Sequence, residues 1–165
     1  GENMIVTTKT GDQGTTEIQG GRISKADPLI EVLGDLDELS AECLVLASGF
    51  SGYRKSMKQI VTQLSAASAM LSGYGEADLG RFIRMLEIEI ESNVKAAGEF
   101  RFHYPFDNPE SAALNRLRAI SRRVERHWWK LQETRKTDPS LGVYLNRISD
   151  YFYALQIQSA AGSEI

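Results

Sequence analysis

The stretch ESAALNRLRAISRRVERHWWKLQETRK, residues 110–136, decides the fold of this chain. At about 100° per residue, its large apolar side chains fall within an arc of about 80° on one side of a helix. These apolar positions are Leu117, Ile120, Val124, Trp128 and Leu131. A stripe of this width is typical of a helix that packs one face against a core. The stretch therefore predicts a long helix with one buried face and a basic remainder.

The same spacing of apolar residues recurs on both sides of this segment. Asp27 and Pro28 are typical of an N-cap followed by proline at the first helical position. Segments rich in glycine or containing proline separate the periodic stretches from one another. Helices are therefore predicted at about 28–48, 53–73, 77–97, 110–136 and 140–161.

Length and composition favour one helical domain. The chain has 165 residues, of which 42% are hydrophobic and 25% are charged, and it contains only four prolines. That length suffices for one domain with a real core and is short for two. We therefore expect an all-α fold, a five-helix antiparallel bundle formed by a single domain over residues 1–165.

Charge and cysteine content narrow the class of protein. The formal net charge of −3 argues against bulk binding to nucleic acid or to an anionic membrane. The sequence has no apolar run of transmembrane length and no signal-peptide pattern. Cys43 is the single cysteine, which excludes an internal disulfide and fits a reducing compartment. We expect a cytoplasmic protein without nucleic-acid or membrane partners.

Polar residues border the core stripe of the fourth predicted helix. The helical spacing places four of them on one adjacent strip: Arg118, Arg122, Glu125 and Trp129. Two other arginines, Arg123 and Arg126, are expected to point to solvent. A solvated helix face is the ordinary explanation for such a run of charge.

Two further helices carry polar residues beside their apolar stripes. On the fifth, Asn146 and Asp150 lie one turn apart. On the first, Asp37 lies next to Leu33 and Leu44, where a carboxylate is costly unless a cation such as Arg118 meets it. Each residue alone is more often a member of a structural ion pair. Together they predict a polar rim along one edge of the bundle, where helical folds build sites.

Several familiar chemistries are excluded by the residues present. The two histidines, His103 and His127, form no Glu-x-x-His pair, so a di-iron centre is not expected. Residues 7–28, TTKTGDQGTTEIQGGRISKADP, do not end in the Gly-Lys-Ser/Thr of a Walker loop. Their glycines, threonines and lysines permit the backbone to wrap an anion. A flexible polar N-terminus explains the same composition, and these residues alone leave both readings open.

Three ordered blocks resemble one family, the propanediol-utilisation type of ATP:cob(I)alamin adenosyltransferase. The blocks are TKTGDQGTTEIQGGRISKADPLIEVLGDLDEL at 8–39, FHYPFDNPESAALNRLRAISRRVER at 102–126 and LNRISDYFYAL at 145–155. They are similar to the family's Thr-Arg/Lys-x-Gly-Asp-x-Gly lead, its Phe-x-x-Pro loop with the arginine-rich helix, and its Asn-Arg-Leu-Ser-Asp-Tyr-Phe. Order and spacing hold across nearly the whole chain.

The resemblance implies a five-helix bundle of ferritin-like architecture that forms a homotrimer and binds ATP between neighbouring subunits. By position, an irregular N-terminal segment would wrap the triphosphate with Thr8, Lys9, Thr10, Gly11, Gly14, Thr15 and Lys25. Arg122, Glu125 and Asn146 would complete the nucleotide site. Arg118 and Asp37 match an ion pair across the subunit interface. Phe102 matches an aromatic residue that the family places against the lower face of the corrin.

The resemblance also implies the chemistry and the partners. The substrates would be ATP, with Mg²⁺, and cob(I)alamin. The cobalt attacks the 5′ carbon of ATP, so the protein supplies positioning and charge stabilisation and no general base. No resident metal ligands are expected. A corrinoid reductase or an adenosylcobalamin-dependent enzyme is expected as a protein partner.

Some positions depart from the family pattern. Phe106 and Asp107 stand where Gly-Gly is usual, and Gln13 replaces a frequent lysine. Ser40 and Asn115 stand where Asn and His are common. These departures motivate an alternative: a diverged carrier or regulator that binds nucleotide or corrinoid without adenosyl transfer. A purely structural helical protein is a third reading.

Overall fold

The computed structural model describes residues 4–99 and 104–160. In these two ranges the chain forms five α-helices, one short 3₁₀ helix (η1) and a two-stranded hairpin. The helices are α1 (Pro28–Gly49), α2 (Arg54–Leu71), α3 (Leu79–Ala97), α4 (Pro109–Gln132) and α5 (Ser140–Ala160), with η1 at Ser51–Tyr53 and strands β1 (Thr15–Ile18) and β2 (Gly21–Ser24). The predicted all-α bundle is confirmed. The fourth helix is shorter than predicted: it ends at Gln132, whereas the sequence predicted an end at 136.

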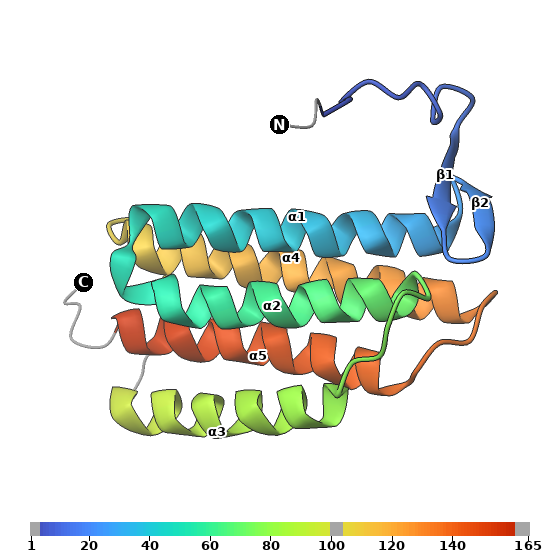
Figure 1. The fold of residues 1–165 in the computed structure, drawn as a ribbon. Coiled ribbons are helices and arrows are strands. Elements are labelled where there is room, and N and C mark those ends of the chain that lie inside the picture. Colours follow the sequence, from blue (N-terminus) through green and yellow to red (C-terminus); the bar gives the residue numbers. More distant parts are fainter. Residues whose placement is uncertain (1–3, 100–103, 161–165) are drawn as a thin grey trace.

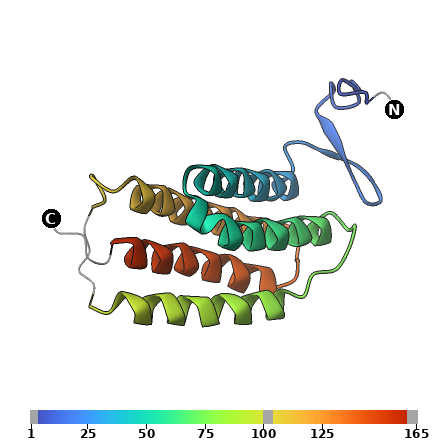
Figure 2. The ribbon, with the colours of Figure 1, turned by 60° about the vertical axis from the view of Figure 1, so that its left-hand side comes forward.

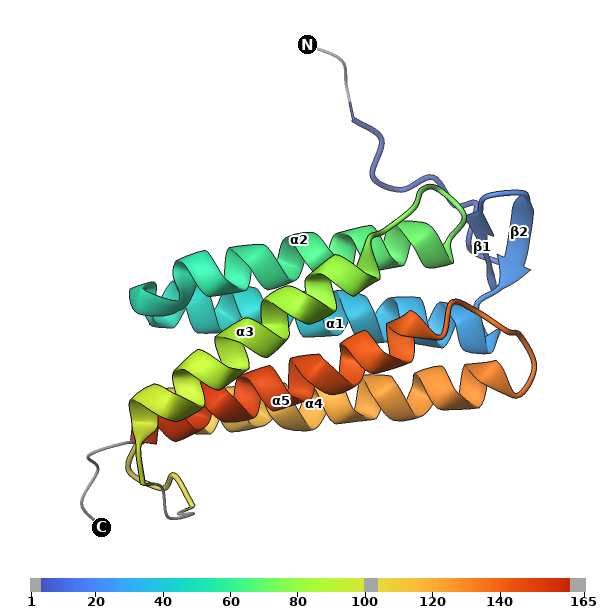
Figure 3. The same ribbon diagram turned by 90° about the horizontal axis from the view of Figure 1, so that it is seen from below.

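The helices stack so that α1 and α3 lie on opposite sides of the bundle. α1 packs against α2 and α4, whereas α5 packs against α4 and α3 (Figures 1 and 2). Viewed from below, α3 runs obliquely from the middle of α2 toward the end of α5 (Figure 3). α4 thus packs on both α1 and α5, and its buried residues include all five of the predicted apolar stripe. No helix in the described ranges is long and apolar enough to cross a membrane.

Side-chain caps set the starts of the helices. Asp27 accepts a hydrogen bond from the Leu29 amide at 2.8 Å, and Pro28 follows it at the first helical position. Asn108 and Pro109 repeat this arrangement at the start of α4, where Asn108 Oδ1 accepts from the Ser111 amide at 2.9 Å. A cap satisfies an amide that the helix itself leaves unpaired, and proline lacks that donor. The predicted Asp27–Pro28 start is confirmed.

An antiparallel series of two ion pairs and one histidine–carboxylate hydrogen bond joins α1 to α4. Arg116 pairs with Glu42 at 2.8 Å, Arg123 with Glu38, and His127 with Asp35. The prediction that Arg123 points to open solvent is therefore wrong, since part of the basic face of α4 meets the acidic face of α1. Exposed pairs each stabilise by only about 0–1 kcal/mol. Their order along the two helices nevertheless favours one register of packing.

The N-terminal segment contains regular structure that the sequence analysis did not predict. β1 and β2 pair antiparallel, with Thr15 opposite Ser24, and the turn between them uses Gly20 at φ 97°. Such a φ suits glycine, which has no Cβ to clash with the backbone. The Gln19 amide donates to the Ser72 carbonyl at 3.0 Å, which attaches the hairpin to the end of α2. The segment is thus only partly irregular.

The thiol of Cys43 should be unreactive in the folded protein. Cys43 lies in the core, where loss of solvation, aided by the charge of Glu42, raises the pKa of its thiol to about 12 from 9.0. Thiolate is the reactive form, so labelling by a disulfide reagent near pH 8 should be about 10³-fold slower than in urea-unfolded protein. Because the folded-state pKa is the higher one, this thiol's contribution to stability is complete below pH 9 and declines as the pH rises toward 12. Rapid native labelling would contradict the buried position.

Candidate functional site

Two predicted arginines lie together in a pocket between α4 and α5. Arg118 and Arg122 are on consecutive turns of α4, and with Asp150 and Tyr153 of α5 they line a pocket of about 200 Å³ that Ser149 completes. Arg118 donates from Nε and Nη2 to Asn115 Oδ1 at 3.2 and 3.1 Å, which fixes the direction of its guanidinium. Arg122 is exposed, and no ion pair between described residues involves it. The pocket therefore presents a guanidinium fork suited to an anion.

The remaining polar residues extend this strip along both helices. Glu125 accepts a hydrogen bond at 3.2 Å from the indole nitrogen of Trp129, whose side chain is 59% exposed. Asn146 is exposed on α5, one turn before Asp150. Of the two predicted strips, Arg118 and Arg122 of α4 and Asp150 of α5 therefore line the same pocket.

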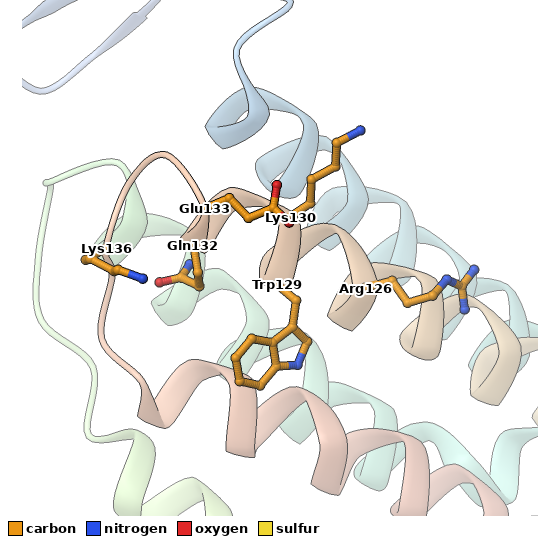
Figure 4. Close-up of a pocket in the computed structure, with 6 residues that line it drawn as sticks. All are labelled: Arg126, Trp129, Lys130, Gln132, Glu133 and Lys136. Atoms are coloured by element: carbon orange, nitrogen blue, oxygen red, sulfur yellow. The ribbon is translucent and has the colours of Figure 1, made fainter.

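A second and larger pocket lies at the C-terminal end of α4. It has a volume of about 560 Å³ and is lined by Arg126, Trp129, Lys130, Gln132, Glu133 and Lys136 (Figure 4). Trp129 projects from α4 toward α5 in this view, whereas Arg126 extends away from the other lining residues. Three of the six lining side chains are cationic and one is anionic. This end of α4 is therefore a positively charged extension of the arginine strip.

The predicted phosphate-wrapping loop folds into a series of tight turns. The Asp12 amide donates to the Lys9 carbonyl at 3.2 Å, and the Gly14 amide donates to the Gly11 carbonyl at 3.1 Å. Lys9 and Gly14 both have positive φ, at 63° and 82°. A positive φ lets the backbone reverse direction within a few residues, so the loop turns sharply at both positions.

Two cations from the hairpin hold this loop in place. Lys25 Nζ donates to the Gly11 carbonyl at 3.0 Å, and Arg22 donates to the carbonyls of Thr10 and Thr15 at 2.8 and 2.9 Å. Thr8 and Thr10 share a hydrogen bond between their hydroxyls at 3.1 Å. The role of Arg22 was missed, because only the pairing of β1 with β2 brings it back to the loop. These hydrogen bonds give the loop a defined shape.

The loop and the arginine pocket are separate within one chain. The N-terminal segment stands off the α1 end of the bundle (Figures 1 and 2). No hydrogen bond or ion pair between described residues links the loop, residues 8–15, to Arg118 or Arg122. Within one chain, the loop and the arginine pocket therefore do not meet to form a single site.

The environment of Asp37 differs from the prediction. Asp37 is exposed, and it lines a pocket of about 490 Å³ between α1 and α2 together with Leu33 and Leu44. The buried carboxylate of α1 is instead Asp35, which is 8% exposed and pairs with His127 of α4. Asp37 and Arg118 line different pockets of the chain, so they do not pair within it.

The aromatic residue that was predicted to face the corrin belongs to the segment before α4. Phe102 and His103 lie outside the described residues. Phe106, which replaces a usual glycine, is 89% exposed, and its ring lies 6.1 Å from that of Tyr104. Within the described ranges no group of three or more His, Cys, Asp and Glu side chains is arranged to hold a metal ion.

Comparison with known proteins identifies the family of the chain. The family model for cobalamin adenosyltransferase matches residues 6–158. The corrinoid adenosyltransferase of Bacillus subtilis is 32% identical, covering 92% of this chain and 84% of the relative. The corrinoid adenosyltransferase PduO of Citrobacter freundii is 34% identical over 92% of this chain, but the chain spans only 49% of that relative, and likewise 48% of PduO from Salmonella typhimurium.

A solved structure shares the fold. A variant PduO-type ATP:corrinoid adenosyltransferase from Lactobacillus reuteri, complexed with cobalamin and ATP, superposes with a TM-score of 0.82 at 25% identity. The match covers 95% of this chain and 93% of that structure. Because the family model and the Bacillus relative both span nearly all of the sequence, the chain belongs to the cobalamin adenosyltransferase family.

Proposed function

We propose that this protein transfers the 5′-deoxyadenosyl group of ATP to the cobalt of cob(I)alamin and releases triphosphate. The observation that carries the proposal is that a chain of this family has both a hydrogen-bonded N-terminal loop and an exposed arginine pocket. The solved relative from Lactobacillus reuteri is complexed with both cobalamin and ATP, which supports the choice of substrates.

The ATP site is proposed to form between subunits. The loop of one subunit would contribute Thr8, Lys9, Thr10, Gly11, Gly14, Thr15 and Lys25, and α4 and α5 of the next would contribute Arg122, Glu125 and Asn146. Asp37 and Arg118 belong to different pockets of one chain, so an ion pair between them requires two unlike faces to meet. Interfaces of unlike faces generate a closed ring when the rotation permits, and a homotrimer is the ring we propose.

The chemistry requires charge stabilisation more than acid–base catalysis. Cobalt supplies the electron pair of the new Co–C bond, and the C5′–O bond breaks with its electrons leaving on triphosphate. Arg122, the loop amides and Lys25 would stabilise the negative charge that grows on the leaving group. Mg²⁺ bound to the polyphosphate would add to that stabilisation. Phe102 would lie against the lower face of the corrin and exclude water and the lower ligand.

The proposal also covers the extent of the domain, the cellular location and the protein partners. Residues 1–165 would form one adenosyltransferase domain. A single buried cysteine suits a reducing compartment, which supports a cytoplasmic location. A corrinoid reductase, or an enzyme that uses adenosylcobalamin, would be the protein partner.

Anaerobic incubation with ATP, Mg²⁺ and chemically reduced cobalamin tests the proposal. We expect the visible spectrum to change to that of a light-sensitive Co–C product, with triphosphate released in equal amount. A mixture that lacks ATP is the control. Absence of the light-sensitive product at full cobalamin reduction would reject adenosyl transfer.

A second candidate function rests on the loop before α4. Phe106 is 89% exposed where the family usually has glycine, and its ring lies 6.1 Å from that of Tyr104. Asp107 stands at the second usual glycine. If these side chains obstruct the corrin, the protein binds ATP without transferring adenosyl and acts as a carrier or regulator. ATP binding by calorimetry without a Co–C product would identify this case.

A further inference from the structure

A cleft between α2 and α3 lies apart from the residues assigned to the adenosyltransferase site. It has a volume of about 360 Å³, and its lining includes Lys55, Lys58, Gln63, Arg81, Phe82 and Met85. The cleft exists because α3 packs on α5 and crosses α2 only obliquely (Figure 3). None of its lining residues belongs to the loop, to α4 or to α5.

One lining residue is a buried amide that is only half satisfied. Gln63 is 2% exposed, and its Oε1 accepts a hydrogen bond at 2.8 Å from the hydroxyl of the fully buried Tyr144. Gln63 Nε2 is buried and has no hydrogen-bond partner among the described residues. Buried polar groups are nearly always paired, because an unpaired donor retains the full cost of its lost hydration. The side-chain N–H of Gln63, a residue that lines the cleft, therefore lacks an acceptor.

The rest of the lining combines positive charge with apolar surface. Lys55, Lys58 and Arg81 are exposed, and no ion pair between described residues involves any of them. Phe82 and Met85 supply apolar surface, and the Phe82 ring lies 6.0 Å from that of Tyr144. A small-molecule site typically has this composition, apolar walls with a few polar groups that fix orientation.

We propose that the α2–α3 cleft binds a small amphipathic carboxylate with a second oxygen acceptor at the far end of its apolar body. The carboxylate lies at the rim among Lys55, Lys58 and Arg81. The apolar body lies against Phe82 and Met85, and the second oxygen accepts the N–H of Gln63. The proposal does not depend on adenosyl transfer.

Three matched probes test each part of this assignment on the full chain. 4-Acetylbenzoate has the carboxylate, the apolar ring and a ketone oxygen at the opposite end. 4-Ethylbenzoate lacks the oxygen acceptor, and methyl 4-acetylbenzoate lacks the charge. We expect 4-acetylbenzoate to bind about tenfold more tightly than either analogue in NMR titrations, as befits one well-placed hydrogen bond or charge contact. Its titration should shift the side-chain NH₂ resonance of Gln63.

Variants on the surface of the cleft complete the test without disturbing the core. Arg81→Gln should weaken 4-acetylbenzoate about fivefold to tenfold by removing a rim cation. Lys95→Gln, which makes the same charge change on α3 outside the cleft, should leave the affinity unchanged. Equal binding of 4-ethylbenzoate, an unmoved Gln63 resonance, or no binding of any probe at millimolar concentration would each overturn the proposal.

Discussion

Replacing Arg122 by alanine should weaken ATP binding by about 1.5–3 kcal/mol, the range measured for hydrogen bonds to charged groups. Arg122 is exposed in the chain, lines the pocket between α4 and α5, and forms no ion pair with another described residue. Its guanidinium is therefore available to a polyphosphate. Between two subunits the contact would be shielded from water, which strengthens it. Calorimetric titration with MgATP measures the change directly.

Two further variants separate a specific contact from a general loss of charge. Arg116→Ala removes the same charge from α4 at a residue that pairs with Glu42 of α1, and we expect its ATP affinity to stay within about twofold, as for an exposed pair. Arg122→Lys keeps the charge but loses the planar fork, so it should recover only part of the affinity. Unchanged affinity in Arg122→Ala would refute the assignment of this pocket to ATP.

The helices were predictable because local patterns determine them. On α4 the apolar period fixed which side faces the core, and Asn108, like Asp27, supplies the side-chain cap that starts its helix. The strip beside that core stripe was predictable by the same arithmetic, and the structure places Arg118 and Arg122 in one pocket with Asp150. The C-terminal end of α4 was not predictable from the sequence. The residues that follow Gln132 are polar, so no periodic apolar residue marks where the helix stops.

Asp37 shows what periodicity cannot determine. Its neighbours Leu33 and Leu44 looked like core residues, yet Leu44 is 58% exposed and lines an open pocket with Asp37. Apolar residues recur at the same helical spacing whether they pack in the core of their own chain or against another chain. The face that misled the prediction is therefore the face we propose to meet the arginine side of a second subunit.

Contacts between residues on different helices or strands also could not be predicted from the sequence. The Asp35–His127 pair joins α1 to α4, and Arg22 reaches the loop only after β1 and β2 pair. Neither contact has a local signal, because the partners are distant in sequence and the residues have no motif. Within the N-terminal segment, strands of four residues are too short for alternation of polar and apolar residues to be recognised.

Replacing Gly142 by alanine should destabilise the fold, although alanine is ordinarily the better helix former. Gly142 is in the first turn of α5, where an added Cβ would lie 2.3, 2.7 and 3.0 Å from Cζ3, Cη2 and Cε3 of Trp128. The indole is 2% exposed, and its nitrogen donates to Thr137 Oγ1 at 3.1 Å, so it has little room to move. Overpacking of this kind costs about 1–3 kcal/mol. Urea unfolding followed by circular dichroism measures the loss.

Gly80 provides the matched control, because it too lies in the first turn of a helix. A Cβ there would meet only the tip of the flexible Arg84 side chain at 3.3 Å and Asp78 Oδ1 at 3.7 Å. Gly80→Ala should therefore be neutral or stabilise by up to about 1 kcal/mol, as helix propensity alone predicts. Opposite signs for the two substitutions would show that close packing of α4 on α5 requires glycine at position 142. If Gly142→Ala instead stabilises as Gly80→Ala does, Trp128 is free to move, and the close packing of α4 on α5 that positions the arginine pocket is refuted.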